Sequence, residues 1–198
     1  MPLIKKIILA WVLSGVYLSA FAQIEVARLM TKTIVPDGFG HLVSQNLSAT
    51  GFGAFLNLGF SVREAGSVSA EGGFYYFKID DNNIAIAPVL IGYRQVFTGN
   101  DYGFYLEPLA GYTFGGTDLQ KSNALGNPLY QSNGNQLDQK VAGATTGIGF
   151  GYLFQPSGRI RFNLGIRYEH TFVTGDPSLN IFSIRLSHAF SFGRRDDY

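Results

Sequence analysis

The sequence alternates between apolar and polar residues with a period of two, and this period limits the fold more than any other feature. A period of two puts alternate side chains on opposite faces of a β-strand, whereas an amphipathic helix repeats every 3.6 residues. Residues 159–172 show the pattern most clearly. Their even positions are apolar or aromatic apart from one histidine, and their odd positions are polar, charged or glycine. The chain is therefore predicted to be all-β.

Seven further segments follow the same period, although in 24–33 the charged residues Glu25, Arg28 and Lys32 do not share one face. Most connections are short and dense in Gly, Asn, Asp, Pro and Ser, which form turns. Two are long, residues 34–47 and residues 115–138. An even number of strands with no repeat and no second domain predicts one antiparallel up-and-down barrel. The predicted strands are 24–33, 51–61, 67–79, 84–97, 102–114, 139–154, 159–172 and 180–192.

The first 22 residues have the pattern of an export signal. Lys5 and Lys6 precede a mostly apolar stretch, and an A-x-A cleavage site ends at Ala22, directly before Gln23. A transmembrane anchor is the alternative, but the small-residue site after the apolar stretch favours a cleaved signal. We therefore expect a signal peptide over 1–22 and a β-barrel domain over 23–198.

The composition excludes several classes of protein. There is no cysteine, so disulfide scaffolds, cysteine-ligated zinc and thiol catalysis are ruled out. The formal net charge of +1 gives no electrostatic reason to expect nucleic acid as a partner. Charged residues make up only 15% of the chain, whereas glycine accounts for 25 of 198 residues and aromatic residues for 15%. This balance indicates a surface that faces something other than water.

The alternation fits two kinds of barrel, because the apolar face could point into a soluble core or outward into lipid. Glycines crowd the polar face, as a narrow eight-stranded lumen requires and a water-facing row does not. Aromatic residues gather towards the strand ends, like the girdles of membrane barrels. Both long connections would also emerge on the side opposite the N-terminus, which is the usual arrangement in outer membranes. These features favour a transmembrane barrel.

The strand patterns resemble the small eight-stranded outer-membrane β-barrels of Gram-negative bacteria, the OmpA/OmpX-like family. The residues that carry the resemblance are the aromatic-glycine segments 103–112 and 163–168 and the closing strand 184–192. The resemblance covers about residues 23–198, and it implies an integral protein of the cell outer membrane.

If the odd faces of most strands point inward, charged side chains share the lumen, and Arg94 joins them from a strand of opposite parity. Four-residue turns would place Glu71, Gly92 and Glu107 in one row, with Arg94 diagonal to both acids. Arg167 and Arg185 would face this row across the barrel. We predict a network of ion pairs that fills the lumen, because unpaired buried charge is strongly unfavourable. The alternative is a gated narrow pore. The predicted network is Glu71, Arg94, Glu107, Arg161, Arg167, Glu169 and Arg185.

No constellation of residues predicts catalysis, a metal site or a cofactor. His170 and His188 share the lipid-facing parity but would lie near opposite rims, too far apart for the hydrogen bond that general-base chemistry needs. His41 falls in the first long connection. The glycines of 147–151 superficially resemble a nucleotide loop, but no helix pattern follows them. Residues 80–83 could bind a divalent cation, but turn formers in a turn explain them better.

The sequence therefore predicts a non-catalytic barrel with a structural or surface-interaction role, exerted through extracellular loops 34–47 and 115–138. The expected partners are outer-membrane lipid, the barrel-assembly machinery during insertion, and an extracellular ligand of the loops. A narrow porin-like channel is the alternative function, and a soluble lipocalin-like carrier is a more distant one.

Overall fold

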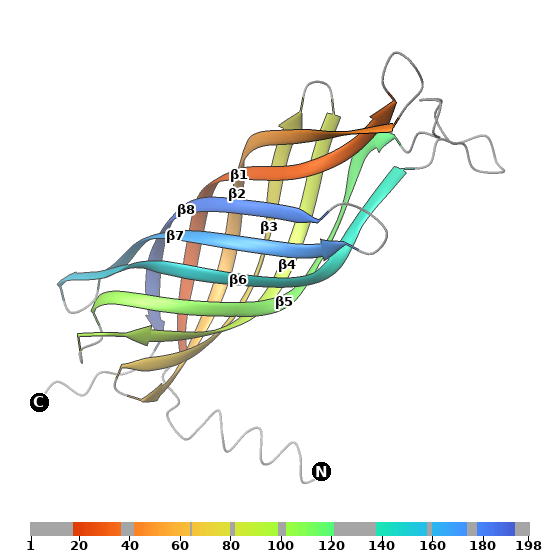
Figure 1. Cartoon of the computed structure of the whole chain (residues 1–198). Helices are drawn as coiled ribbons and strands as arrows, with labels where there is room; N and C mark the ends of the chain where they lie inside the picture. The colour runs from red at the N-terminus through yellow and green to blue at the C-terminus, as the bar shows by residue number, and fades with distance from the viewer. Residues whose placement is uncertain are drawn as a thin grey trace, which may run out of the picture.

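The computed structural model describes residues 18–36, 42–63, 65–79, 82–98, 102–120, 138–157, 160–173 and 178–192 (Figure 1). Eight β-strands account for nearly all of them, as the period of two predicts. The strands are β1 (Leu18–Pro36), β2 (Leu42–Arg63), β3 (Gly66–Ile79), β4 (Asn82–Val96), β5 (Gly103–Gln120), β6 (Asp138–Ser157), β7 (Ile160–Val173) and β8 (Leu179–Phe192).

The strands form one closed sheet in which each strand pairs antiparallel with its neighbours in the chain. β1 also pairs with β8, so the sheet has no free edge around the barrel. Closure satisfies the backbone hydrogen bonds of every strand within the sheet. The predicted eight-stranded up-and-down barrel is confirmed. Over the same described residues, the structure has no helix long and apolar enough to span a bilayer.

The two faces of the strands separate as the alternation predicts. On β7, Leu164 and Ile166 point outward and are about half exposed, whereas Asn163 and Arg167 point inward and are almost fully buried. On β4 the parity is reversed, so Ile91 points outward and Arg94 inward, also as predicted. The apolar face is therefore the outer surface of the barrel, and the polar face lines its lumen.

The structure assigns a face to the strand whose pattern was least regular. In β1, Gln23 and Glu25 point inward and are buried, whereas Arg28 and Lys32 point outward and are exposed. The mixed parity of the charges thus reflects two environments along one strand. The acid lies in the lumen, and the two cations lie further towards the loop that connects β1 to β2.

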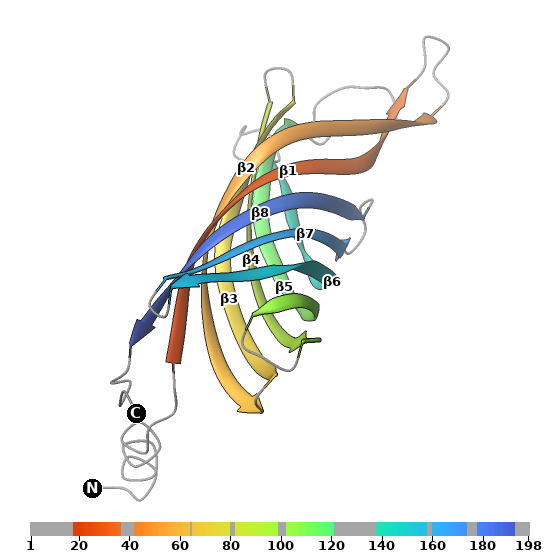
Figure 2. The same ribbon diagram turned by 90° about the vertical axis from the view of Figure 1, so that its left-hand side faces the viewer.

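The first long connection is shorter than predicted, because strand pairing continues through most of 34–47. β1 and β2 remain paired up to Pro36 opposite Leu42. Within the described residues, the pairing of β1 with β8 ends at Met30, and that of β2 with β3 begins at Gly51. Figures 1 and 2 show the result, a two-stranded hairpin that projects past the neighbouring strands. The second predicted connection is also shorter, since residues 115–120 belong to β5 and Asp138 belongs to β6, and residues 121–137 lie outside the described residues.

β1 begins at Leu18, within the predicted signal peptide. Residues 1–17 lie outside the described part of the chain, so cleavage between Ala22 and Gln23 stays a prediction. Cleavage there would remove the first five residues of β1. Glu25 and the rest of the strand to Pro36 would remain in the mature protein.

Candidate functional site

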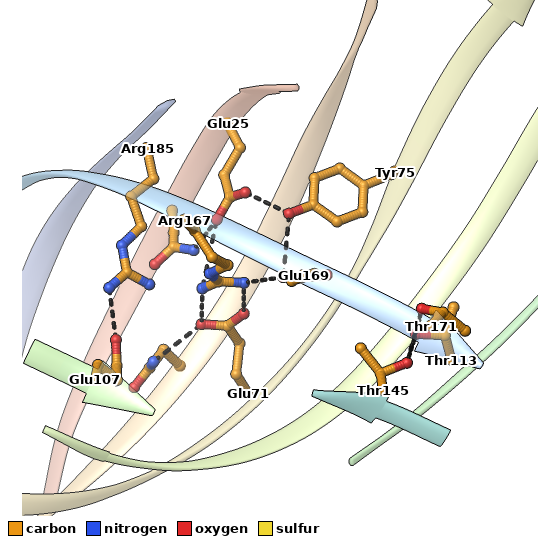
Figure 3. Close-up of polar contacts among 12 residues, drawn as sticks. Glu25, Glu71, Tyr75, Glu107, Thr113, Thr145, Arg167, Glu169, Thr171 and Arg185 are labelled. Carbon is orange, nitrogen blue, oxygen red and sulfur yellow. Dashed lines mark hydrogen bonds and ion pairs between the residues drawn. The ribbon is translucent and has the colours of Figure 1, made fainter. Parts of the chain in front are cut away.

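The lumen contains the charged side chains that the barrel withdraws from both water and lipid. Of the residues predicted to share it, six are buried on the inward face: Glu71, Arg94, Glu107, Arg167, Glu169 and Arg185. Arg161 has the same inward parity but is only half-buried, near the start of β7. The buried charges form two clusters, one around Arg167 and one around Glu107 (Figure 3).

In the first cluster one guanidinium faces three carboxylates from three strands. Arg167 binds Glu71 in a bidentate manner, with Nη1 2.5 Å from Oε1 and Nη2 2.7 Å from Oε2. Its Nη1 also donates to Glu169 at 2.8 Å, and its Nη2 lies 3.5 Å from Glu25. Bidentate contacts of this kind are the strongest that arginine makes. The side chain therefore ties β7 to β3 and β1 across the lumen.

Neutral donors complete the coordination of these carboxylates. The hydroxyl of Tyr75 donates to Glu25 at 2.5 Å and lies 3.4 Å from Glu169. The amides of Gln23 and Asn57 donate to Glu25 and Glu71 at 2.5 and 3.1 Å. Each donor replaces water that a carboxylate would otherwise need.

In the second cluster the charges are reversed, because one carboxylate accepts from two guanidiniums. Glu107 lies 3.0 Å from Arg94 Nη2 and 2.5 Å from Arg185 Nη2. Ser69 donates a further hydrogen bond at 2.9 Å. Arg185 also donates to the hydroxyl of Tyr105 at 2.8 Å. The two clusters together hold four acids and three arginines, so the charges of the lumen almost balance.

A glycine row makes room for these long side chains. A Cβ atom on Gly149 would lie 2.9 Å from Nη2 of Arg185 and 3.7 Å from Cβ of Glu107. A larger residue would therefore displace the guanidinium that pairs with Glu107. The glycines on the polar face of β6 fill the role expected of small residues in a narrow lumen.

The predicted row of Glu71, Gly92 and Glu107 is wrong by two residues in each hairpin. Glu71 lies opposite Leu90, and Gly92 lies opposite Leu109. The β3–β4 turn is shorter than assumed, because Ile79 pairs with Asn82, and the β4–β5 connection is longer. A shift of two residues leaves every side chain on its original face, so the inward set is unchanged. The observed register brings Arg94 against Glu107.

Apolar side chains fill the lumen at the loop-side end, the end of the barrel that carries the β1–β2 connection. Leu29, Phe77, Ile86 and Ile181 are all at most 2% exposed and belong to one cluster that draws on six strands. At the opposite end Val96, Tyr105 and Leu153 form a smaller apolar cluster. The charged layer thus lies between two apolar layers, an arrangement that the alternation of the sequence does not predict.

Sequence reasoning also missed Glu25 and Tyr75 as members of the charged layer. The charges of its strand show no common parity, although Gln23, Glu25 and Ala27 share the buried face and could have indicated that Glu25 points inward. The bond of Tyr75 to Glu25 joins β3 to β1, which are not adjacent strands, so no local pattern indicates it.

The histidines of the outer face lie apart, as predicted. His170 Nδ1 lies 2.8 Å from the amide oxygen of Asn180 at the loop-side rim. His188 lies opposite Phe162 near the other rim, with their rings 5.1 Å apart. His41 and Asp80 lie outside the described residues. Within those residues no group of three or more His, Asp or Glu side chains is arranged to hold a metal ion.

Comparison with solved structures identifies the fold. Neisserial surface protein A superposes with a TM-score of 0.60 at 11% identity, over 88% of this chain and 97% of that one. Ail, the attachment invasion locus protein of Yersinia pestis, gives 0.53 at 15% identity in its complex with the heparin analogue sucrose octasulfate, over 86% and 99%. Ail alone gives 0.52 at 14% over the same shares.

The fold is that of the eight-stranded outer-membrane β-barrels. Identities this low show the fold and nothing finer. No family model and no curated protein matches the sequence. The resemblance noted from the strand patterns is confirmed at the level of architecture, and the role of this barrel has to be argued from its own residues.

We predict that Arg167→Met lowers the free energy of unfolding by about 3–5 kcal/mol, because it leaves three buried carboxylates without their common partner. Arg94→Met is the matched control. Its loss should be smaller, since Glu107 keeps Arg185. Urea unfolding in lipid vesicles, followed by circular dichroism, measures both. Equal losses would show that the three carboxylates do not depend on Arg167.

We also predict that the wild-type barrel gives no conductance steps in planar bilayers. The charged layer and the apolar cluster above it occupy the path that ions would take. A large porin reconstituted in the same bilayers is the positive control. Reproducible channel steps from the purified wild-type protein would contradict a filled lumen and revive the narrow-pore hypothesis.

Proposed function

We propose that this protein is an integral barrel of the bacterial outer membrane that presents its loop-side end at the cell surface for interaction, without catalysis. The observation that supports the membrane location is the outer surface. Ile24, Leu56 and Ile91, from three different strands, are each more than 60% exposed there. A soluble protein does not expose an apolar belt that runs around its whole circumference. Hydrocarbon is the solvent that such a surface requires.

Aromatic residues border the belt at both ends, at the depth where membrane barrels carry their girdles. Tyr112 and Phe172 lie outward towards the loop-side end, and Tyr93 and Tyr102 lie outward towards the other. The belt implies outer-membrane lipid as a permanent partner and the barrel-assembly machinery as a transient one. The filled lumen argues against a soluble lipocalin-like carrier, because a carrier needs its interior for the ligand.

The projecting β1–β2 hairpin supports the surface-interaction part of the proposal. Among the described residues, β1 beyond Met30 and β2 before Gly51 pair only with each other. Backbone donors and acceptors on both outer edges of the hairpin can therefore pair with an extended segment of another protein. β5 ends at Gln120 at the same end of the barrel, and residues 121–137 lie outside the described residues. The hairpin is therefore the described part of the surface that an extracellular partner would meet first.

We predict that Leu164→Arg, in the middle of the outward face of β7, lowers the free energy of unfolding in lipid vesicles by about 2–4 kcal/mol. Phe97→Arg is the control. Phe97 is 62% exposed but lies just past the end of β4, where the same change should lower stability by about 0–1 kcal/mol. Urea titrations of both variants measure the difference. No difference between the two positions would place the belt outside hydrocarbon and overturn the membrane location.

We predict that replacing residues 33–45 by an Asn-Gly turn leaves insertion intact and abolishes surface binding. Lys32 and Asn46 are cross-strand partners, so a two-residue turn can join them. Adhesion of cells that display each variant to immobilised serum proteins is the measurement. A variant shortened within 121–137 serves as the comparison. Wild-type adhesion by both variants would overturn the surface-interaction role.

A further inference from the structure

Among the side chains that the structure describes, three charged ones lie on the outward face of the strands, and all three are positive. They are Arg28 and Lys32 on β1 and Lys78 on β3, all exposed and all near the loop-side end. We call these residues, with Ser48 and Thr50 of β2 between them, the rim patch. Charge on a surface otherwise made for hydrocarbon is unfavourable unless it meets a polar or oppositely charged group.

The strand register brings the members of the rim patch together. Arg28 lies opposite Thr50, and the pair of Gly51 with Phe77 is one residue away from Thr50 on β2 and from Lys78 on β3. Arg28 and Lys78 thus lie on the two strands that flank β2, and two strand spacings amount to about 10 Å. Lys32 pairs with Asn46, four residues further towards the loop.

The guanidinium of Arg28 is held in place by hydroxyl groups. Its Nη1 donates to Oγ1 of Thr50 at 3.1 Å, and its Nη2 donates to Oγ of Ser48 at 2.6 Å. These two bonds orient the side chain and leave further N–H donors of an exposed guanidinium for an outside acceptor. A planar, oriented guanidinium suits the oxygens of a phosphate group.

The rim patch lies where the apolar belt ends. Next to it towards the middle of the barrel are Val26 and Phe52, which are 63% and 56% exposed. Phe52 packs against Tyr76 with ring centroids 5.8 Å apart. Apolar side chains that suit hydrocarbon thus lie next to cationic side chains that suit an anion, on the side towards the middle of the barrel. A lipid has the same order along its length, with acyl chains below a phosphate.

Among the side chains that the structure describes, the outward charge lies on β1 and β3, whereas Asp138 and Lys140 at the loop-side end of β6 lie outside the described side chains. At the same height on β7 and β8 the outward residues are Tyr168 and Phe182, then His170 and Asn180, and none of them carries a fixed charge. The two hydroxyl bonds that order Arg28, with Lys32 on the same strand and Lys78 on β3, indicate a site rather than a girdle.

We propose that the rim patch binds the phosphate group of an anionic lipid in the leaflet that faces the loops. Arg28 and Lys78 contact the phosphate oxygens, Lys32 adds charge from the loop side, and the acyl chains lie against Val26 and Phe52. The proposal rests on the membrane location proposed above. Asp80 and Asp81, which follow Lys78 in the sequence, lie outside the described residues, so Arg28 is the residue on which the test depends.

The experiment compares lipid selectivity of the full-length mature protein in mixed nanodiscs of phosphatidylcholine and phosphatidic acid. Native mass spectrometry after release from the nanodisc counts the lipids that remain bound. Wild type should prefer phosphatidic acid, and Arg28→Gln should reduce the preference about fivefold, the effect of one charge near a membrane surface. Arg63→Gln is the matched control. It removes the same charge at the opposite end of β2 and should leave the preference unchanged.

Two further measurements distinguish a lipid phosphate from free phosphate, and the lipid site from the membrane location. Inorganic phosphate added to pure phosphatidylcholine nanodiscs should not be retained, because the acyl chains supply part of the binding. Heat-modifiable migration on gels verifies that each variant has folded. Equal preference in Arg28→Gln and Arg63→Gln, or none in wild type, overturns the lipid site while leaving the membrane location intact. Failure of the folded wild type to enter nanodiscs overturns the membrane location itself.

Discussion

The structure depends on ion pairs that join opposite walls of the lumen. A soluble domain gains stability by burying apolar side chains, but this barrel turns most of those side chains outward. The interior must then be stabilised by polar contacts between side chains. Arg167 binds carboxylates from β1 and β3, and Arg185 of β8 binds Glu107 of β5. These contacts cross the barrel, so they fix its cross-section in a way that the hydrogen bonds between neighbouring strands cannot.

The ion pairs also account for the distribution of the smallest residues. Glycine on β6 weakens a strand in general, because it adds conformational freedom and no packing. Here Gly149 lies beside the Arg185 guanidinium, where any Cβ would intrude on the pair with Glu107. The glycines of β6 therefore lower the local strand propensity but leave space in the lumen. The apolar clusters at both ends then shield the charged layer from the aqueous phases on either side.

The sequence was sufficient to predict the fold, because strict alternation, with glycines on the polar face, fits a barrel whose apolar face points outward. The alternation also predicted the inward and outward faces correctly for β4, whose parity is reversed. The register of the strands could not be predicted from the same pattern. The β3–β4 and β4–β5 pairings each differ by two residues from the assumed ones, and a shift of two changes no face and leaves no trace in the pattern.

Contacts between distant strands were harder still to predict. Nothing in the residues around Tyr75 indicates a hydroxyl bonded to Glu25, because the bond depends on how closely the walls of the closed barrel approach. The apolar cluster at the loop-side end was missed for a related reason. Phe77 of β3 and Ile181 of β8 look like ordinary strand residues, and only closure of the barrel brings them into one cluster. The β1–β2 hairpin lies within 34–47, which the sequence predicts as a long connection, whereas strand pairing continues there up to Pro36 opposite Leu42.

The early start of β1 bears on how the barrel closes. β1 and β8 share thirteen residue pairs, from Leu18 opposite Phe192 to Met30 opposite Asn180. Five of them involve residues that signal cleavage after Ala22 would remove. The seam between the first and last strands would then be the shortest in the barrel, with Glu25 beside Arg185 near its middle. A newly made chain would then close its barrel across the junction that has the fewest backbone pairs.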